Sequence, residues 1–257
     1  MHRFFIPPDV VNTMNSTITL PKELAHQVRD VLRLNHGEQL LLLDNSGDEI
    51  VASVSAISKT GVDVYLLERR AGKSESSVRI ILCQGLLKSA RFEWILEKGT
   101  ELGVSVFSPI LCRRSMAGLE DAGPSKIARW KRIIEEAAEQ CGRSRLPELL
   151  PIRPLIHALN DIPAGAIALM PWEEEHSCSL RKALTASKVP QSIVSRSDTQ
   201  TTTTVVLFIG PEGGLMAEEV ALAQRHGVQV VSLGARILRA ETAALTTVAN
   251  VMYELGG

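Results

Sequence analysis

The segment Val205-Val206-Leu207-Phe208-Ile209-Gly210-Pro211-Glu212-Gly213-Gly214 joins five apolar residues to a loop with three glycines. Five apolar residues bounded by a turn predict a buried strand, and the residues from about Ala217 predict a helix. A plain tight turn needs only one or two glycines. Three of them allow positive φ and let the backbone approach a ligand closely, while Pro211 stiffens the turn. Because ligands of open α/β sheets bind beyond the carboxyl ends of strands, this loop is a candidate ligand-binding loop.

A second loop, Leu233–Ala244, also follows an apolar run and opens an expected helix. Glu241 and Thr242 suit the first turn of that helix, where carboxylates and hydroxyls satisfy free N–H groups. Arg239 has no such reason to be there, because a cation at a helix N-terminus opposes the helix dipole. We therefore expect Arg239 to pair with a carboxylate, either Glu241 or Glu212, or to contact a ligand.

Outward from these loops, residues 78–257 alternate between apolar runs and amphipathic segments. Ser89 and Pro124 are suited to begin two of the helices. Such alternation predicts an α/β domain with a mainly parallel sheet that is covered by helices on both faces. The polar stretch Ser187–Thr204 is expected to be a loop. The expected strands are 78–83, 104–111, 166–170, 205–209 and 228–233.

The first 72 residues have a different pattern, in which short apolar runs alternate with turns. Strands are expected over 39–43, 50–57 and 62–67, after a helix over about 22–32. This pattern predicts a small β-barrel-like domain with one helix. The polar residues 73–77 predict a linker, so the expected domains are 1–72 and 78–257.

Composition and missing motifs exclude several classes of protein. No apolar run approaches the roughly 20 residues that span a bilayer, and the four cysteines and six histidines have no usual metal-ligand spacing. We therefore expect a cytoplasmic protein without a metal or a membrane partner. The chain has no G-x-G-x-x-G, P-loop or G-x-S-x-G motif, which disfavours Rossmann enzymes, P-loop NTPases and α/β-hydrolases.

The net charge is −1, but residues 79–153 hold 13 Lys/Arg and 9 Asp/Glu. A locally basic middle segment is compatible with phosphate binding, and equally with a merely solvated surface.

Several segments together resemble the SPOUT methyltransferases, whose C-terminal chain forms a trefoil knot. The region from Leu207 to Ala244 resembles the last two motifs of that family. The Glu-Leu-Gly and Glu-Gln-x-x-Arg segments narrow the resemblance to members that methylate N3 of a uridine in 16S ribosomal RNA. The other resembling segments are 2–5, 26–32, 84–88, 98–104, 113–115 and 136–143.

The resemblance implies a knotted catalytic domain, a PUA-like N-terminal RNA-binding domain and a homodimer. It also implies that S-adenosylmethionine donates a methyl group to uridine N3 in the decoding region of small-subunit ribosomal RNA. Because residues 1–72 hold 7 Lys/Arg and 9 Asp/Glu and can supply little phosphate attraction, the assembled particle is the expected substrate. The loop Pro171-Trp172-Glu173 is expected to add a wall to the cofactor site. The expected cofactor-binding residues are Met170, Pro171, Ile209, Gly210, Pro211, Glu212, Gly213, Gly214, Leu233, Gly234, Ile237, Leu238, Arg239, Thr242 and Ala243.

The catalytic and RNA-binding residues are less sharply defined. Uracil N3 carries a proton that must leave, so a base or a group that stabilises the uracil anion is expected. Arg239 is the candidate stabiliser and Glu241 the candidate base, with Glu101 and Glu212 as alternatives; each carboxylate also suits a structural role. The candidates for contact with RNA phosphates are Lys88, Arg91, Arg113, Arg114 and Arg143.

Two other functions remain open at this level. One is a SPOUT enzyme that acts on transfer RNA or at another position. The other is a non-catalytic RNA-binding module that keeps the knot as a scaffold, although the intact glycine loop and the segment Ile237–Thr242 argue against it.

Overall fold

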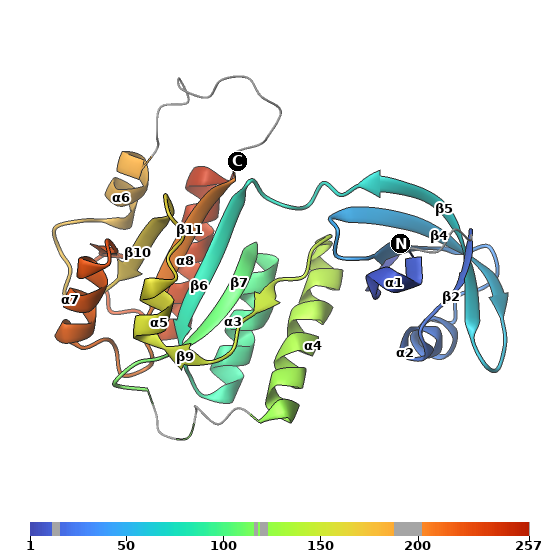
Figure 1. Cartoon of the computed structure of the whole chain (residues 1–257), viewed down its shortest axis with the longest axis horizontal. Coiled ribbons are helices and arrows are strands. Elements are labelled where there is room, and N and C mark those ends of the chain that lie inside the picture. Colours follow the sequence, from blue (N-terminus) through green and yellow to red (C-terminus); the bar gives the residue numbers. More distant parts are fainter. Residues whose placement is uncertain (12–15, 116–117, 119–122, 188–201, 257) are drawn as a thin grey trace. The chain divides into compact units, whose positions relative to one another are not determined.

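The computed structural model describes residues 1–11, 16–115, 118, 123–187 and 202–256 (Figure 1). Its contacts divide the chain into two units, one of residues 1–75 with 135–146 and one of residues 76–134 with 147–257. Residues 135–146 were expected in the larger domain and lie in the first unit instead. Most of the expected loop over Ser187–Thr204 lies outside the described residues. Among the helices of the described part, none has the length and apolar character needed to cross a membrane.

The first unit is built on a five-stranded sheet with the strand order β1-β3-β4-β5-β2. β1 pairs with β3 in parallel, and the remaining pairs are antiparallel. In the described part of the chain no pairing joins the two edge strands, β1 and β2. The strands are β1 (His2–Phe5), β2 (Thr17–Thr19), β3 (Gln39–Leu43), β4 (Asp48–Ile57) and β5 (Val62–Ala71).

The expected helix over 22–32 consists of two pieces. An α-helix, α2 (Lys22–His26), continues into a π-helical segment, η1 (Gln27–Val31), where the N–H of Leu32 donates to the carbonyl of Gln27 at 2.9 Å. Leu24 and Val28 are buried in the core of this unit. Val31, at the end of η1, is 65% exposed, so the expectation that it shares their buried face is wrong. A further short helix, α1 (Pro8–Val11), follows β1.

Residues 135–146 belong to the first unit because polar side chains tie them to its strands. The Glu139 carboxylate accepts a hydrogen bond from the Phe5 N–H at 2.9 Å, and burial, which outweighs this bond, raises the pKa of Glu139 to about 7. Arg143 forms an ion pair with Glu75 at 2.8 Å, and its side chain is only 7% exposed. The Asn45 side chain accepts a hydrogen bond from the Leu146 N–H at 2.7 Å.

The second unit contains a parallel sheet with the strand order β12-β10-β11-β6-β7-β8, and β9 also pairs with β7. The mainly parallel α/β sheet expected from the sequence is therefore present. The strands are β6 (Val78–Gly85), β7 (Val104–Leu111), β8 (Glu148–Leu149), β9 (Arg153–Pro154), β10 (Ile167–Pro171), β11 (Thr203–Ile209) and β12 (Gln229–Val231). The helices are α3 (Ser89–Glu101), α4 (Pro124–Cys141), α5 (Leu155–Asn160), α6 (Leu180–Ser187), α7 (Ala217–Arg225) and α8 (Ala240–Leu255).

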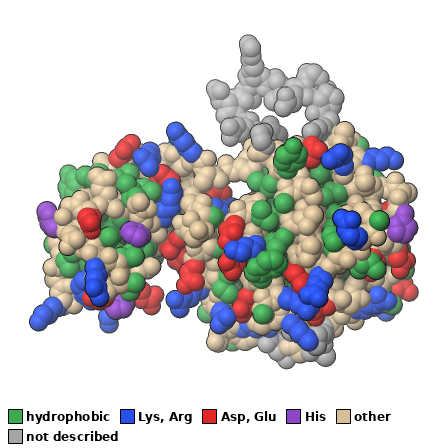
Figure 2. Space-filling model, turned by 180° about the vertical axis from the view of Figure 1, so that it is seen from behind, with side chains coloured by type: hydrophobic (Ala, Val, Ile, Leu, Met, Phe, Trp, Pro, Cys, Tyr) green, Lys and Arg blue, Asp and Glu red, His purple; other side chains and the backbone are tan. Residues whose placement is uncertain are grey.

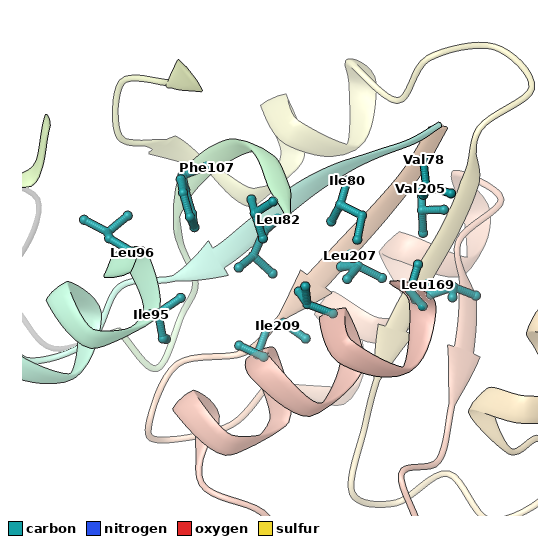
Figure 3. Close-up of a cluster of buried hydrophobic side chains, with 14 of the residues drawn as sticks. Val78, Ile80, Leu82, Ile95, Leu96, Phe107, Leu169, Val205, Leu207 and Ile209 are labelled. Carbon is teal, nitrogen blue, oxygen red and sulfur yellow. The ribbon is translucent and has the colours of Figure 1, made fainter. Parts of the chain in front are cut away.

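Helices cover both faces of this sheet, and β11 shows why its sequence is apolar throughout. Val205, Leu207 and Ile209 pack toward α3, α6 and α8 (Figure 3). Val206 and Phe208 point to the other face and pack against α5 and α7. A parallel strand buried on both faces has no position for a polar residue, so the run from 205 to 209 is continuous rather than alternating.

Candidate functional site

A cavity of about 250 Å³ lies at the carboxyl ends of β10, β11 and β12. This is the edge of a parallel sheet where ligands are expected. Three loops form the wall, and each of them follows one of these strands. The lining residues are Pro171, Trp172, Glu173, His176, Ile209, Gly210, Pro211, Glu212, Gly213, Gly214, Leu215, Leu233, Gly234, Ala235, Arg236, Ile237, Leu238, Arg239, Ala240 and Ala243.

The glycine loop after β11 is held in a tight turn by its own backbone and by β6. The Gly214 N–H donates to the Pro211 carbonyl at 2.9 Å, and Gly214 has a φ of +73°. The Gln84 side-chain amide donates to the Gly210 carbonyl at 3.3 Å. A Cβ at Gly85 would lie 2.5 Å from the nitrogen of Pro211. The end of β6 therefore packs directly on the loop backbone and leaves no room for side chains there.

Neighbouring side chains also press on the two final glycines of this loop. A Cβ at Gly213 would lie 2.9 Å from the Cβ of Arg114, and one at Gly214 would lie 2.8 Å from Oε1 of Glu173. The Arg114 guanidinium donates to the Gly213 carbonyl at 3.1 Å. Both glycines line the cavity. The loop therefore has no room for a side chain at either of these two positions.

The N-terminus of α8 brings charged groups to the same place. Arg239 is the residue before the first turn, is exposed and lines the cavity. Arg239 was expected either to pair with a carboxylate or to contact a ligand. Within the described part of the chain it has no carboxylate partner. Its predicted partners pair elsewhere: Arg91 lies 2.6 Å from Glu212 and 3.8 Å from Glu241. Glu241 is 8% exposed, and its Oε2 has no hydrogen-bond partner among the described residues.

Most of the expected cofactor-binding residues line the cavity, and two do not. Met170 is fully buried in the core between the sheet, α5 and α7. Side chains alternate along β10, and that of Met170 points to this face of the sheet and not into the cavity. Thr242 is exposed on the first turn of α8 and is absent from the cavity wall. The expected wall at Trp172 and Glu173 is present.

Sequence reasoning missed five lining residues: His176, Leu215, Ala235, Arg236 and Ala240. Ala235, Arg236 and Ala240 lie inside the second predicted loop but were not among its expected cofactor contacts, and Leu215 directly follows the glycine loop. His176 had only a weak signal, since it lies five residues beyond the end of β10.

Two of the candidate bases are away from the cavity. Glu241 lies behind the wall, beside Arg91. Glu101 is at the last turn of α3, where it accepts a hydrogen bond from Lys98 at 2.8 Å. Glu212 is the candidate carboxylate that lines the cavity.

The candidate RNA-binding cations divide into free and paired groups. Lys88, Arg113 and Arg114 are exposed near the carboxyl ends of β6 and β7, with no carboxylate partner in the described ranges. Arg91 is exposed but paired with Glu212. Arg143 does not have the exposure expected of a phosphate contact, because its guanidinium is buried against Glu75. On the face seen in Figure 2, basic and acidic side chains are interspersed, so that face has no broad basic surface.

The cavity combines apolar walls with a few polar groups. Ile209 and Leu215 are buried beside it. The indole Nε1 of Trp172 is buried and has no hydrogen-bond partner among the described residues. A ligand with an acceptor near this atom would satisfy it. Within the same residues, no three His, Cys, Asp or Glu side chains are grouped as metal ligands.

Residues 74–252 match the protein family described as RNA methyltransferase domain. The chain is 30% identical over 243 residues to ribosomal RNA small subunit methyltransferase E of Bacillus subtilis, an alignment that covers 93% of this chain and 90% of the relative. It is 32% identical over 252 residues to the protein of the same name from Synechocystis sp., covering 97% and 77% of the two chains.

A solved structure has a similar fold over the whole chain. It is a ribosomal RNA small subunit methyltransferase E from Neisseria gonorrhoeae bound to S-adenosyl methionine, with a TM-score of 0.81 and 28% identity. The superposition covers 98% of this chain and 97% of that one.

Proposed function

The chain belongs to the RNA methyltransferase family, and from this we propose that it transfers a methyl group from S-adenosylmethionine to small-subunit ribosomal RNA. We further propose that the acceptor is N3 of a uridine in the decoding region of 16S ribosomal RNA. The observation that carries the proposal is the cavity formed by the glycine loop, the loop after β10 and the N-terminus of α8. Relatives that align over nearly the whole chain are named as methyltransferases of small-subunit ribosomal RNA, which supports the substrate class.

The residues of the cavity fit S-adenosylmethionine. This cofactor has a flat adenine, a ribose with hydroxyls and a charged methionine part, and it supplies an already activated methyl group. Backbone groups of Ile209–Gly214 and of the loop before α8 would hold the adenine and ribose. The unpartnered Trp172 Nε1 is available to an acceptor atom, and Glu173, Glu212 and Arg236 offer charges for the ammonium and carboxylate.

The chain's own task is then to position the base and to stabilise charge. When uracil N3 gives its proton to Glu212 on the cavity wall or to water, negative charge spreads to the neighbouring carbonyl oxygens. Arg239 is exposed on the cavity wall without a carboxylate partner among the described residues. Its guanidinium is therefore free to donate to an anionic oxygen, which is the arrangement that stabilises developing charge. We assign this stabilising role to Arg239, whereas Glu241, the candidate base, is not among the residues that line the cavity.

The proposal is tested by methylation of small ribosomal subunits from a strain that lacks this protein. Purified protein and S-adenosylmethionine are incubated with the subunits, with naked 16S ribosomal RNA or with a short oligonucleotide, and the nucleosides are analysed by mass spectrometry. We expect 3-methyluridine in the particle and little in the oligonucleotide, because a folded RNA offers both a shape and presented unpaired bases for recognition, whereas a short oligonucleotide lacks the shape. A methyl group on another atom or base contradicts the N3 assignment. Equal rates on all three substrates contradict the proposal that the first unit acts as a PUA-like domain that recognises the particle.

RNA affinity is expected to depend on the free cations Lys88, Arg113 and Arg114. Each phosphate contact releases condensed counterions, so its loss reduces the slope of log K against log salt by about 0.7 to 0.9. Arg113→Ala should weaken RNA binding and reduce this slope by the amount expected for one phosphate contact. Turnover at saturating RNA should stay nearly intact. Salt titration of RNA binding measures this. Arg225→Ala is the control, because Arg225 is an exposed cation at the end of α7, away from the cavity.

A homodimer is the proposed assembly, and α8 offers surface for it. Ala244, Val248 and Val251 of this helix are fully buried in the core. Outside this core, Leu245 is half-buried and Tyr253 is 87% exposed. Exposed aromatic residues are enriched in protein interfaces.

Sedimentation at micromolar concentration should therefore give a mass of two 28.0 kDa chains, and Tyr253→Glu should reduce it to one. The matched control is Tyr65→Glu, since Tyr65 is exposed in the first unit. A mass of one chain for the unaltered protein would contradict the dimer.

A further inference from the structure

Arg91 joins the two parts of the cavity wall that come from different strands. It lies in the first turn of α3. Its Nη1 is 2.6 Å from Oε1 of Glu212, in the glycine loop after β11. Its Nε is 3.8 Å from Oε1 of Glu241, in the first turn of α8 after β12. Arg91 itself does not line the cavity.

The charges around Arg91 make this link important. Two carboxylates approach a single guanidinium, and the side chains of Glu212 and Glu241 are only 22% and 11% exposed. Partly buried charges are poorly screened by solvent. Without Arg91, both partly buried carboxylates would lose this neighbouring cation, and Glu241 already has one buried oxygen without a hydrogen-bond partner among the described residues.

We propose that Arg91 is a positioning residue that fixes the distance between the glycine loop and the N-terminus of α8, and that it thereby sets the affinity for the cofactor. This inference rests on the proposed function, because it takes S-adenosylmethionine as the ligand of the cavity. Arg91 acts through Glu212 and Glu241 and does not touch the ligand. Its guanidinium serves better than an ammonium, because separate N–H groups can meet two carboxylates at once.

The experiment measures the dissociation constant of S-adenosylmethionine by calorimetry at a temperature well below unfolding. Arg91→Ala is expected to weaken binding about tenfold, equivalent to about 1.4 kcal/mol. Adding Glu241→Gln should recover part of this loss, because it removes one of the two repelling charges. Arg91→Lys, which keeps the charge and serves if the alanine variant does not fold, should weaken binding less than tenfold but measurably. The control is Arg129→Ala, which removes the ion pair with Glu93 at 2.8 Å, away from the cavity wall.

Three results would overturn the inference. The first is binding by Arg91→Ala within twofold of the unaltered protein. The second is a lowered melting temperature of the cofactor-free variant with an unchanged dissociation constant, which indicates a merely structural role. The third is a reduced salt slope of RNA binding with unchanged cofactor affinity, which makes Arg91 a phosphate contact. The failure of the inference is distinguishable from the failure of the proposed function. If the unaltered protein does not bind S-adenosylmethionine, both fail. If it binds and Arg91→Ala binds equally well, only the inference about Arg91 fails.

Discussion

Gly214→Val is expected to abolish cofactor binding, with a loss of at least about 100-fold in affinity, while the protein remains folded. Gly214 has a φ of +73°, where a β-branched residue is a genuine outlier, and such strain costs on the order of 1–3 kcal/mol. The new side chain would also meet the Glu173 carboxylate, because a Cβ there lies 2.8 Å from Oε1. The loop can relieve both only by moving, and it lines the cavity.

The matched control is Gly165→Val. Gly165 has a similar φ of +77°, but nothing lies within 4 Å of an added Cβ, and it precedes β10 at the opposite edge of the sheet. Both variants should lose stability in thermal unfolding, whereas only Gly214→Val should lose cofactor affinity in calorimetry. Unchanged affinity in Gly214→Val would remove the glycine loop from the site.

Arg239→Ala is expected to lower turnover at saturating RNA by about 100-fold and to leave RNA affinity nearly unchanged. Removing one donor that stabilises developing negative charge in an enzyme typically costs 100-fold to 1,000-fold in rate. A loss confined to turnover indicates an interaction made mainly in the transition state. Single-turnover methylation, paired with a salt titration of RNA binding, measures both effects.

Arg113→Ala provides the opposite comparison, since it should change the salt slope and not the saturated rate. If Arg239→Ala reduces the salt slope while its saturated rate stays normal, Arg239 is another phosphate contact and the catalytic assignment is wrong. If Arg239→Ala loses only cofactor affinity, Arg239 contacts the cofactor and not the reacting uracil.

The sequence could predict the sheet and the cavity because both follow from local patterns. The continuous apolar run 205–209 predicts a strand that is buried on both faces, and β11 packs on both sides. The rule that ligands bind at the carboxyl ends of parallel strands then selected two of the three loops that form the wall. The third loop, at Trp172, was expected from the resemblance and also lines the cavity.

What could not be predicted depends on which distant side chains meet. Arg143 and Glu75 are 68 residues apart, and Arg91 and Glu212 are 121 apart. No local sequence pattern predicts that these charges form ion pairs. Both arginines were therefore expected to be available for contact with RNA phosphates. The assignment of residues 135–146 to the first unit has the same cause, because it rests on contacts such as Phe5 to Glu139.

Neither unit is a continuous stretch of chain, and this limits how the protein can be made. A polypeptide synthesised from its N-terminus cannot complete the first unit until residue 146 has left the ribosome. β6 then has one edge without a partner until β11 follows, at Thr203–Ile209. A gene divided at Glu75 would express a first fragment without Arg143, whose partner Glu75 it keeps. The smallest continuous fragment with both parts of the second unit also contains the whole of residues 135–146, which complete the first.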